Sequence, residues 1–139
     1  MAALVMVVAG CLLTANAAAF CFEEAGATYE ISPMLLWGIA NVESSFVPTA
    51  INRNTNGTYD YGLMQINSSW YRTLGPETWN KLSDPCTNIR VGAWILAQCI
   101  QRHGYTWEAV GCYNSGNKDK GRIYARKVFL VLKAAGYGR

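Results

Sequence analysis

The chain has 139 residues, of which 51% are apolar, 12 are basic and 9 are acidic. That length is enough for one domain around a single hydrophobic core, and the nearly balanced charge gives no support to a nucleic-acid-binding function. The first 20 residues are almost all apolar and carry no charged side chain, whereas the composition of the remaining residues is typical of a folded globular domain.

Residues 1–19 have the features of a secretory signal peptide. The apolar segment Leu4–Leu13 is followed by three alanines at positions 17–19, which suit signal peptidase. Two alternatives stay open, because the residues before Cys11 are similar to a lipobox that would attach a lipid to Cys11, and an uncleaved segment of this length could just span a bilayer. Each outcome places the domain formed by residues 20–139 outside the cytoplasm.

The later cysteines predict two disulfides. Four of them, Cys21, Cys86, Cys99 and Cys112, lie in an exported domain of modest size, where four reduced and buried thiols are the weaker alternative. Cys99 and Cys112 flank a turn near His103, so an antiparallel helix pair would bring them together, and Cys21 would then pair with Cys86. No metal site is expected, because the chain has no Cys-x-x-Cys motif and His103 is its only histidine.

The predicted elements are mainly helices. Ser32 followed by Pro33 is typical of a helix start, Asn56-Gly57 between two β-prone segments predicts a hairpin, and Gly136 is suited to end the last helix. We expect helices over 21–30, 33–46, 68–74, 76–82, 87–103, 106–113 and 121–135, a hairpin over 51–61, and a polar loop over 114–121. The predicted fold class is therefore mainly α (α+β), with one small β-hairpin inserted among helices.

Glu43 is the most informative single residue. On the helix that starts at Pro33, it shares one face with Leu36 and Ile39, so it ends an apolar stripe. A carboxyl in that position is poorly hydrated in its charged form, so its pKa should rise and it could hold a proton near neutral pH. Such a group is suited to general acid catalysis; a helix-capping or ion-pairing role is the alternative.

A second carboxylate, Asp60, follows the predicted hairpin turn. The hairpin could bring it across a cleft from the Glu43 helix, and two carboxylates in unlike surroundings are used for glycoside cleavage. A solvated aspartate at the end of a strand is the alternative. Nearby aromatic and amide side chains could bind sugar rings and N-acetyl groups: Asn52, Asn54, Tyr59, Tyr61, Gln65, Asn67, Trp70, Tyr71, Tyr113 and Asn114.

Four short motifs occur in order along the chain. They are Glu43–Phe46, Tyr61–Asn67, Asp84–Ile89 and Gly111–Gly116. Together they resemble the soluble lytic transglycosylase domain, and in particular the small periplasmic murein-cleaving proteins that accompany type III and type IV secretion, conjugation and pilus systems. Each motif is weak alone, but four in order at matching spacing are specific, and the resemblance runs from about Cys21 to Leu132.

The resemblance implies a lysozyme-like fold in which Glu43 is the essential acid and base. It implies a periplasmic monomer that acts on the glycan strand of peptidoglycan, uses no cofactor and serves a secretion or pilus apparatus. It also implies a set of substrate-binding residues, one of which follows Glu43 directly. They are Ser44, Tyr61, Gly62, Leu63, Met64, Gln65, Asn67, Tyr113 and Asn114.

Two positions depart from the family pattern. Cys112 stands where the family usually has alanine, which supports a Cys99–Cys112 bridge as an addition in this chain. Asp60 is a carboxylate that most transglycosylases lack, and its position is similar to that of the second acid of animal-type lysozymes. The resemblance as a whole leads us to expect a lytic transglycosylase that forms 1,6-anhydromuramyl ends. The alternatives are a lysozyme-type hydrolase and a non-catalytic glycan-binding protein.

Overall fold

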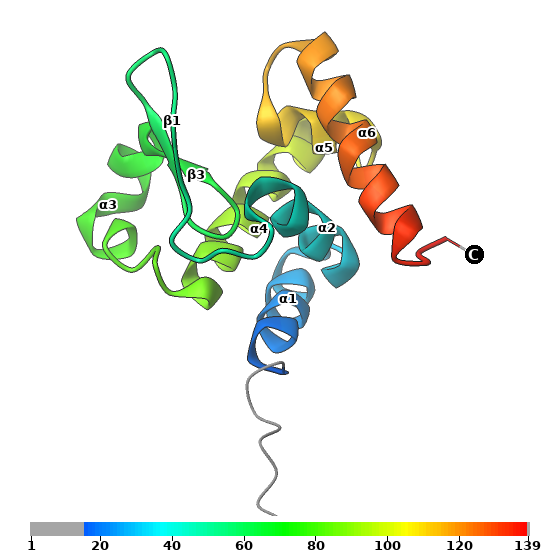
Figure 1. The fold of residues 1–139 in the computed structure, drawn as a ribbon, viewed down its shortest axis with the longest axis horizontal. Helices are drawn as coiled ribbons and strands as arrows, with labels where there is room; N and C mark the ends of the chain where they lie inside the picture. Colours follow the sequence, from blue (N-terminus) through cyan, green and yellow to red (C-terminus); the bar gives the residue numbers. More distant parts are fainter. Residues whose placement is uncertain (1–15, 139) are drawn as a thin grey trace, which may run out of the picture.

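Six α-helices, one 3-10 helix and a three-stranded antiparallel sheet make up the part of the chain that the structure, a computed structural model, describes (Figure 1). That part is residues 16–138, with side chains from Cys21 onward. The predicted signal peptide and Cys11 lie outside it, except for the backbone of residues 16–19. The elements are α1 (Asn16–Tyr29), α2 (Pro33–Ser44), β1 (Ile51–Arg53), β2 (Tyr59–Tyr61), β3 (Ile66–Asn67), η1 (Ser68–Trp70), α3 (Tyr71–Trp79), α4 (Pro85–His103), α5 (Trp107–Asn114) and α6 (Lys118–Ala134).

The 19-residue helix α4 lies at the centre of the molecule and packs against α1 and α5 (Figure 1). Its start is specified locally, because the Asp84 carboxylate accepts a hydrogen bond from the Thr87 backbone N–H at 2.8 Å and Pro85 occupies the first turn. The helix ends at His103, and the next residue, Gly104, has a φ of +72°. None of the helices in the described part is long and apolar enough to cross a membrane.

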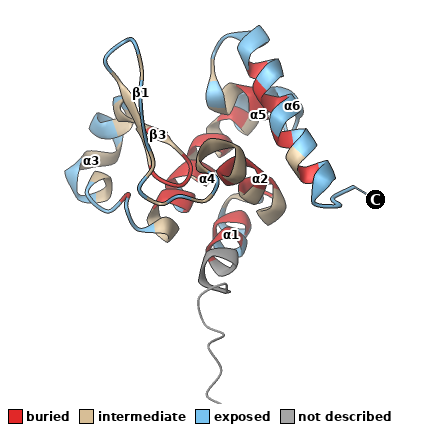
Figure 2. Cartoon of the chain, in the orientation of Figure 1, coloured by how far each residue is buried: buried red, intermediate tan, exposed pale blue. Residues whose placement is uncertain are grey.

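The core lies around α2, which contacts α1, α4 and α6, and Figure 2 shows buried residues on the facing surfaces of these helices. Leu36 and Ile39 of α2, Ile89 and Leu96 of α4 and Val128 of α6 are fully buried. Each such side chain contributes roughly 1.5–3 kcal/mol through its removal from water. The stripe that α2 directs into this core continues to Glu43, so packing of the core decides where that carboxyl lies.

The sheet has the order β1-β2-β3, and it lies beside the helices (Figure 1). The expected hairpin is present, since β1 pairs with β2 across a turn in which Gly57 has a φ of +85°. The third strand was not expected. It is possible because Gly62 and Gln65 have φ values of +82° and +51°, which turn the chain back within four residues.

Two helix boundaries that differ from the sequence-based expectation have a clear physical reason. Helix α2 ends at Ser44 rather than at residue 46, because Ser45 and Phe46 both have positive φ values of +50° and +64°. Helix α6 starts at Lys118 rather than at residue 121, because the Asn117 side chain accepts hydrogen bonds from two backbone N–H groups of its first turn. The predicted polar loop is therefore shorter than expected. Helix α3 contains a kink at residue 75, where the two short predicted helices were expected to separate.

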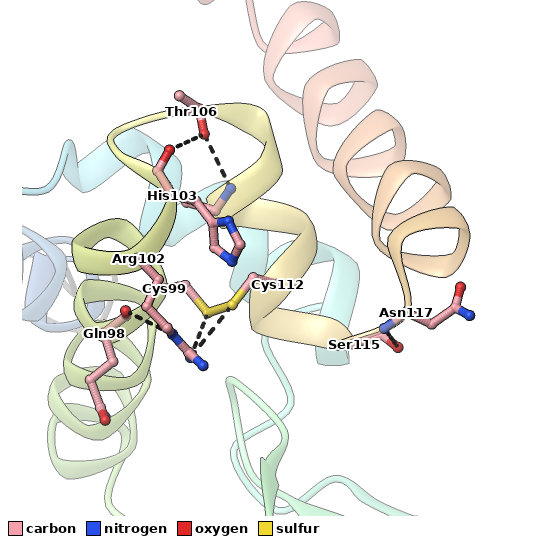
Figure 3. Close-up of a disulfide and its surroundings, with 9 residues drawn as sticks. Gln98, Cys99, Arg102, His103, Thr106, Cys112, Ser115 and Asn117 are labelled. Atoms are coloured by element: carbon pink, nitrogen blue, oxygen red, sulfur yellow. Dashed lines mark hydrogen bonds between the residues drawn. A yellow bond between two sulfur atoms is a disulfide. The ribbon is translucent and has the colours of Figure 1, made fainter.

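Both disulfides are present with the expected pairing. Cys21–Cys86 joins α1 to the start of α4, with the Cα atoms 5.3 Å apart, and Cys99–Cys112 joins α4 to α5, with the Cα atoms 5.8 Å apart. Figure 3 shows the second bridge between the two helices, with the Arg102 guanidinium beside both sulfur atoms. The mainly α fold class, with a small sheet among helices, is confirmed.

Candidate active site

Glu43 lies in the last turn of α2, partly buried at the end of the apolar stripe. Removal from water is the main reason that its pKa rises from 4.5 to about 7. The negative charge of Asp60 adds to this rise, whereas a hydrogen bond from Tyr124 and the positive charge of Lys127 oppose it. Glu43 can therefore hold a proton near neutral pH and can also release it.

The side chain that holds Glu43 in place is Tyr124 of α6. Its hydroxyl donates a hydrogen bond to Glu43 Oε1 at 2.6 Å, and the residue is 5% exposed. Burial raises the pKa of Tyr124 well above its ordinary value, so the phenol keeps its proton and stays a donor. The ring of Tyr113 stacks on that of Tyr124, with the centroids 6.5 Å apart. Glu43 is thus oriented by a neutral donor from a helix far away in the sequence.

The sequence analysis did not identify Tyr124, although a signal was present. Tyr124 lies on the same face of the amphipathic helix as Gly121, Val128 and Leu132, all of which are buried. A tyrosine on a buried stripe needs a hydrogen-bond partner for its hydroxyl. Other helices offer candidate partners where a polar side chain stands at the end of an apolar stripe. Glu43 on α2 is such a side chain.

Asp60 lies in the middle of β2, in surroundings unlike those of Glu43. The strand register places it directly between Asn52 of β1 and Asn67 of β3. Its Oδ1 accepts a hydrogen bond from Asn67 Nδ2 at 2.8 Å, and its Oδ2 accepts from Asn54 at 2.9 Å and from Asn52 at 3.4 Å. Three amide donors therefore orient the Asp60 carboxylate. Its negative charge helps to raise the pKa of Glu43. The structure brings both predicted acids to one region, one in apolar and the other in polar surroundings.

The turn between β2 and β3 is held in place from behind by hydrogen bonds to its backbone. Ser44 Oγ donates to the Leu63 carbonyl at 2.7 Å, directly next to Glu43, and Tyr113 Oη donates to the Met64 carbonyl at 2.7 Å. The side chains of Leu63 and Met64 are 3% and 0% exposed and belong to the core. These four predicted site residues therefore connect α2, the turn and α5. The two hydroxyls do so by donating hydrogen bonds to backbone carbonyls of the turn.

Asn88 of α4 is the buried polar residue that shapes this turn. Its Oδ1 accepts a hydrogen bond from the Met64 backbone N–H at 2.7 Å, and its Nδ2 donates to the carbonyls of Tyr61 and Leu82 at 3.1 and 3.0 Å. A Cβ atom on Gly62 would overlap the Asn88 amide, and Gly62 also has a positive φ. Only glycine fits here, so the glycine of the motif is explained by backbone conformation and close packing.

The other predicted substrate-binding residues are used differently. Gln65 donates from Nε2 to the carbonyls of Ala50 and Gly62, at 3.0 and 2.9 Å, so it stabilises its own turn. Asn67 orients Asp60, and its Oδ1 also accepts a hydrogen bond from the Ser69 backbone N–H at 3.0 Å. Tyr61 is partly exposed in β2, and Asn114 is exposed at the end of α5. Within residues 16–138, no group of His, Cys, Asp and Glu side chains is arranged to hold a metal ion.

Comparison of the sequence with known proteins gives a family model and several relatives. A family model described as "Transglycosylase SLT domain" matches residues 20–128. Invasion protein IagB of Salmonella typhimurium (strain SL1344) is 41% identical over 126 residues, which cover 85% of this chain and 79% of the relative. Protein IpgF of Shigella flexneri is 39% identical over 113 residues, or 79% of this chain and 74% of the relative. An "X polypeptide" of Escherichia coli is 38% identical over 133 residues, or 87% and 79%.

The family model covers most of α1, every element from α2 to α5 and most of α6, including Glu43 and the turn after β2. The motifs that suggested a relationship therefore lie within one continuous match. The fold, a helical body with a small sheet beside the helix that carries the acid, is lysozyme-like. This chain belongs to the Transglycosylase SLT domain family.

Proposed function

We propose that this protein is a lytic transglycosylase that cleaves the β-1,4 bond between N-acetylmuramic acid and N-acetylglucosamine in peptidoglycan and leaves a 1,6-anhydromuramyl end. The observation that carries the proposal is Glu43, a partly buried carboxyl with a pKa of about 7 that accepts a hydrogen bond from Tyr124. Membership of the Transglycosylase SLT domain family supports it.

In the proposed reaction Glu43 acts twice. Its protonated carboxyl gives a proton to the glycosidic oxygen, the bond from that oxygen to the muramyl C1 breaks, and positive charge develops at C1. The Glu43 carboxylate then takes the proton of the muramyl C6 hydroxyl, and the C6 oxygen attacks C1 to close the anhydro ring. Glu43 ends protonated, and no water is consumed. A pKa near 7 suits both steps, because neither protonation state is strongly disfavoured at neutral pH.

Asp60 has a different role in this proposal. Its carboxylate would stabilise the positive charge that develops at C1, and the three asparagine amides that it accepts from would hold it in a fixed orientation. A preoriented charge stabilises a transition state without having to reorganise during the reaction.

A lysozyme-type hydrolase is the second candidate, and Asp60 is the observation that favours it. Muropeptides released from purified sacculi and resolved by mass separate the two reactions, because anhydro products are lighter by one water than products with a reducing end. Anhydromuropeptides as the main product are expected, whereas reducing ends would establish the hydrolase. A protein that releases no muropeptides but still binds sacculi would establish the non-catalytic alternative, against which the orientation of Glu43 by Tyr124 argues.

We also propose that residues 1–19 are removed as a signal peptide and that residues 20–139 act in the periplasm, where they open the wall locally for a secretion or pilus apparatus. The apolar segment and the alanines at 17–19 support export. The similarity of the four motifs to small murein-cleaving proteins of secretion and pilus systems supports an association with such a system, and one relative of the chain is named Invasion protein IagB. N-terminal sequencing of the protein from the cell envelope should begin at Phe20, and an intact Met1 or an acylated Cys11 would contradict cleavage at this position.

A further inference from the structure

A groove of about 840 Å³ lies between α5, α6 and the C-terminal end of α4. None of the residues expected to act in catalysis or to bind the glycan lines it. Its floor is made of small residues, since Gly111 and Gly121 let the two helices approach so closely that a Cβ on Gly111 would lie 2.7 Å from the Gly121 carbonyl oxygen. The missing side chains at these two glycines leave the floor of the groove open, and neither Glu43 nor Tyr124 is among its lining residues.

One wall of the groove is a continuous face of α6. Lys118, Arg122, Arg126 and Phe129 recur at helical spacing along this face, which lies beside the buried face that carries Tyr124. From the first to the last of these residues the helix rises about 16 Å, at about 1.5 Å per residue. An extended peptide of about five residues has the same length. The wall is thus long enough to contact a short chain segment along its length.

The groove is strongly basic. Lys118, Arg122 and Arg126 line it from α6, and Arg102 lines it from α4, against a single lining carboxylate, that of Glu108. Among the residues that the structure describes, only Arg122 of these four cations forms a salt bridge. Figure 3 shows Arg102 on the disulfide sulfurs, which carry no charge to neutralise it. A ligand with negative charges would therefore find positive charges that are not already neutralised.

One end of the groove is aromatic. Trp107 of α5 and Phe129 of α6 pack edge to face with their ring centroids 5.5 Å apart, yet they remain 46% and 45% exposed. Two large aromatic side chains half exposed at the end of a concave surface are typical of a protein interface, where such residues contribute most of the binding energy. This end of the groove is suited to an apolar side chain rather than to a charge.

We propose that this groove binds a segment of a partner protein that carries acidic residues and one large apolar side chain. The acidic residues complement the basic wall, and the apolar side chain packs against the aromatic pair. A peptidoglycan stem peptide has carboxylates but no large apolar group for that end. A bilayer surface would need projecting residues, whereas this surface is concave.

The chain itself offers no suitable occupant. Residues 1–20 contain no acidic side chain, so they would leave the basic wall unneutralised. A second copy that presented the same face would place Arg122 and Arg126 against their counterparts, which like-charge repulsion opposes. The occupant that fits the charges and the aromatic end is therefore a separate, acidic polypeptide.

Selection from a phage-displayed library of random linear peptides, with the protein immobilised, tests this directly. We expect the enriched peptides to combine several acidic residues with an aromatic or leucine side chain. Arg126→Glu should weaken their binding at least about tenfold, because it places like charges in contact, and Phe129→Ala should weaken it as well. Arg72→Glu is the matched control, since Arg72 is an exposed arginine on α3 at the other side of the molecule and should change little.

Exchanging the acidic residues of a selected peptide for lysine should reverse the preference, so that it binds the Arg126→Glu variant better than the wild type. Lys118→Glu, at the exposed start of α6, is the second variant if Arg126→Glu does not fold by circular dichroism. Selected peptides without acidic residues, or peptides that bind both proteins equally, would overturn the proposal. Charge-dependent binding in this groove to phosphatidylglycerol vesicles or to a muramyl tripeptide, or a dimer that Arg126→Glu dissociates, would overturn it too, by showing a different occupant.

Discussion

Glu43 and Asp60 both carry a carboxyl group, but the surroundings of these two groups differ. Glu43 ends an apolar helix stripe, and loss of hydration raises its pKa to about 7. Asp60 lies on a small sheet between asparagines and accepts hydrogen bonds from three amides. The comparison shows that apolar packing on a helix raises the pKa of one carboxyl, whereas the amides of a small sheet fix the orientation of the other.

Replacement of Glu43 should have the largest effect on activity. Glu43→Gln keeps the shape of the side chain and can still accept from Tyr124, but it cannot give and take a proton. We expect muropeptide release from sacculi to fall at least about 10²–10⁴-fold, the contribution of general acid–base catalysis. Glu77→Gln, an exposed glutamate on α3, is the control. Undiminished activity in Glu43→Gln would refute the central role of this residue.

Removal of the negative charge of Asp60 should have the next largest effect on activity. Asp60→Asn keeps most of the size of the side chain but removes the negative charge, and we expect a loss of roughly 10²-fold, comparable to the loss of one electrostatic stabiliser. The loss should appear in kcat more than in KM if the charge acts only in the transition state. Activity near that of the wild type would mean that Asp60 is only a structural residue of the sheet.

The pH dependence of stability tests the raised pKa of Glu43 without an activity assay. Folded Glu43 has a pKa of about 7 against 4.5 for the unfolded chain, so the folded state binds more protons between these values and its stability falls as the pH rises through them. Glu43→Gln removes that loss, which we place on the order of 3 kcal/mol at most. Urea unfolding at pH 5 and pH 8 measures the difference. Equal pH dependence in wild type and variant would contradict a raised pKa.

Tyr124→Phe should have the smallest effect and the most specific one. The hydrogen bond from Tyr124 lowers the pKa of Glu43, so without it that pKa should move further up. The alkaline limb of the pH–rate profile should then shift to higher pH, with a modest change of the maximal rate. Tyr113→Phe is the matched control, because its hydroxyl donates to the Met64 carbonyl, whereas the hydroxyl of Tyr124 donates to Glu43. An unshifted profile would show that Tyr124 does not tune Glu43.

The helical part of the fold was predictable because its signals are local. Proline after Ser32, the acid that caps α4 and the apolar stripe of α2 each lie within a few residues of the feature that they specify. The start of α6 was missed although Asn117 is a strong cap, because the glycines and polar residues around it also fit a loop. Strand β3 was missed since two residues of strand are too short to leave a pattern.

The sequence by itself determined that Glu43 ends an apolar stripe, that four cysteines pair and that four motifs occur in the order of one family. Only the tertiary structure decided what surrounds Glu43, because Tyr124 lies 81 positions away and reaches it through the packing of α6 on α2. The same holds for Asn88, whose side chain shapes a turn 24 residues before it. A pattern along the chain predicts whether a residue points toward the core. The pKa and the orientation of that side chain depend on other side chains that only folding brings into contact with it.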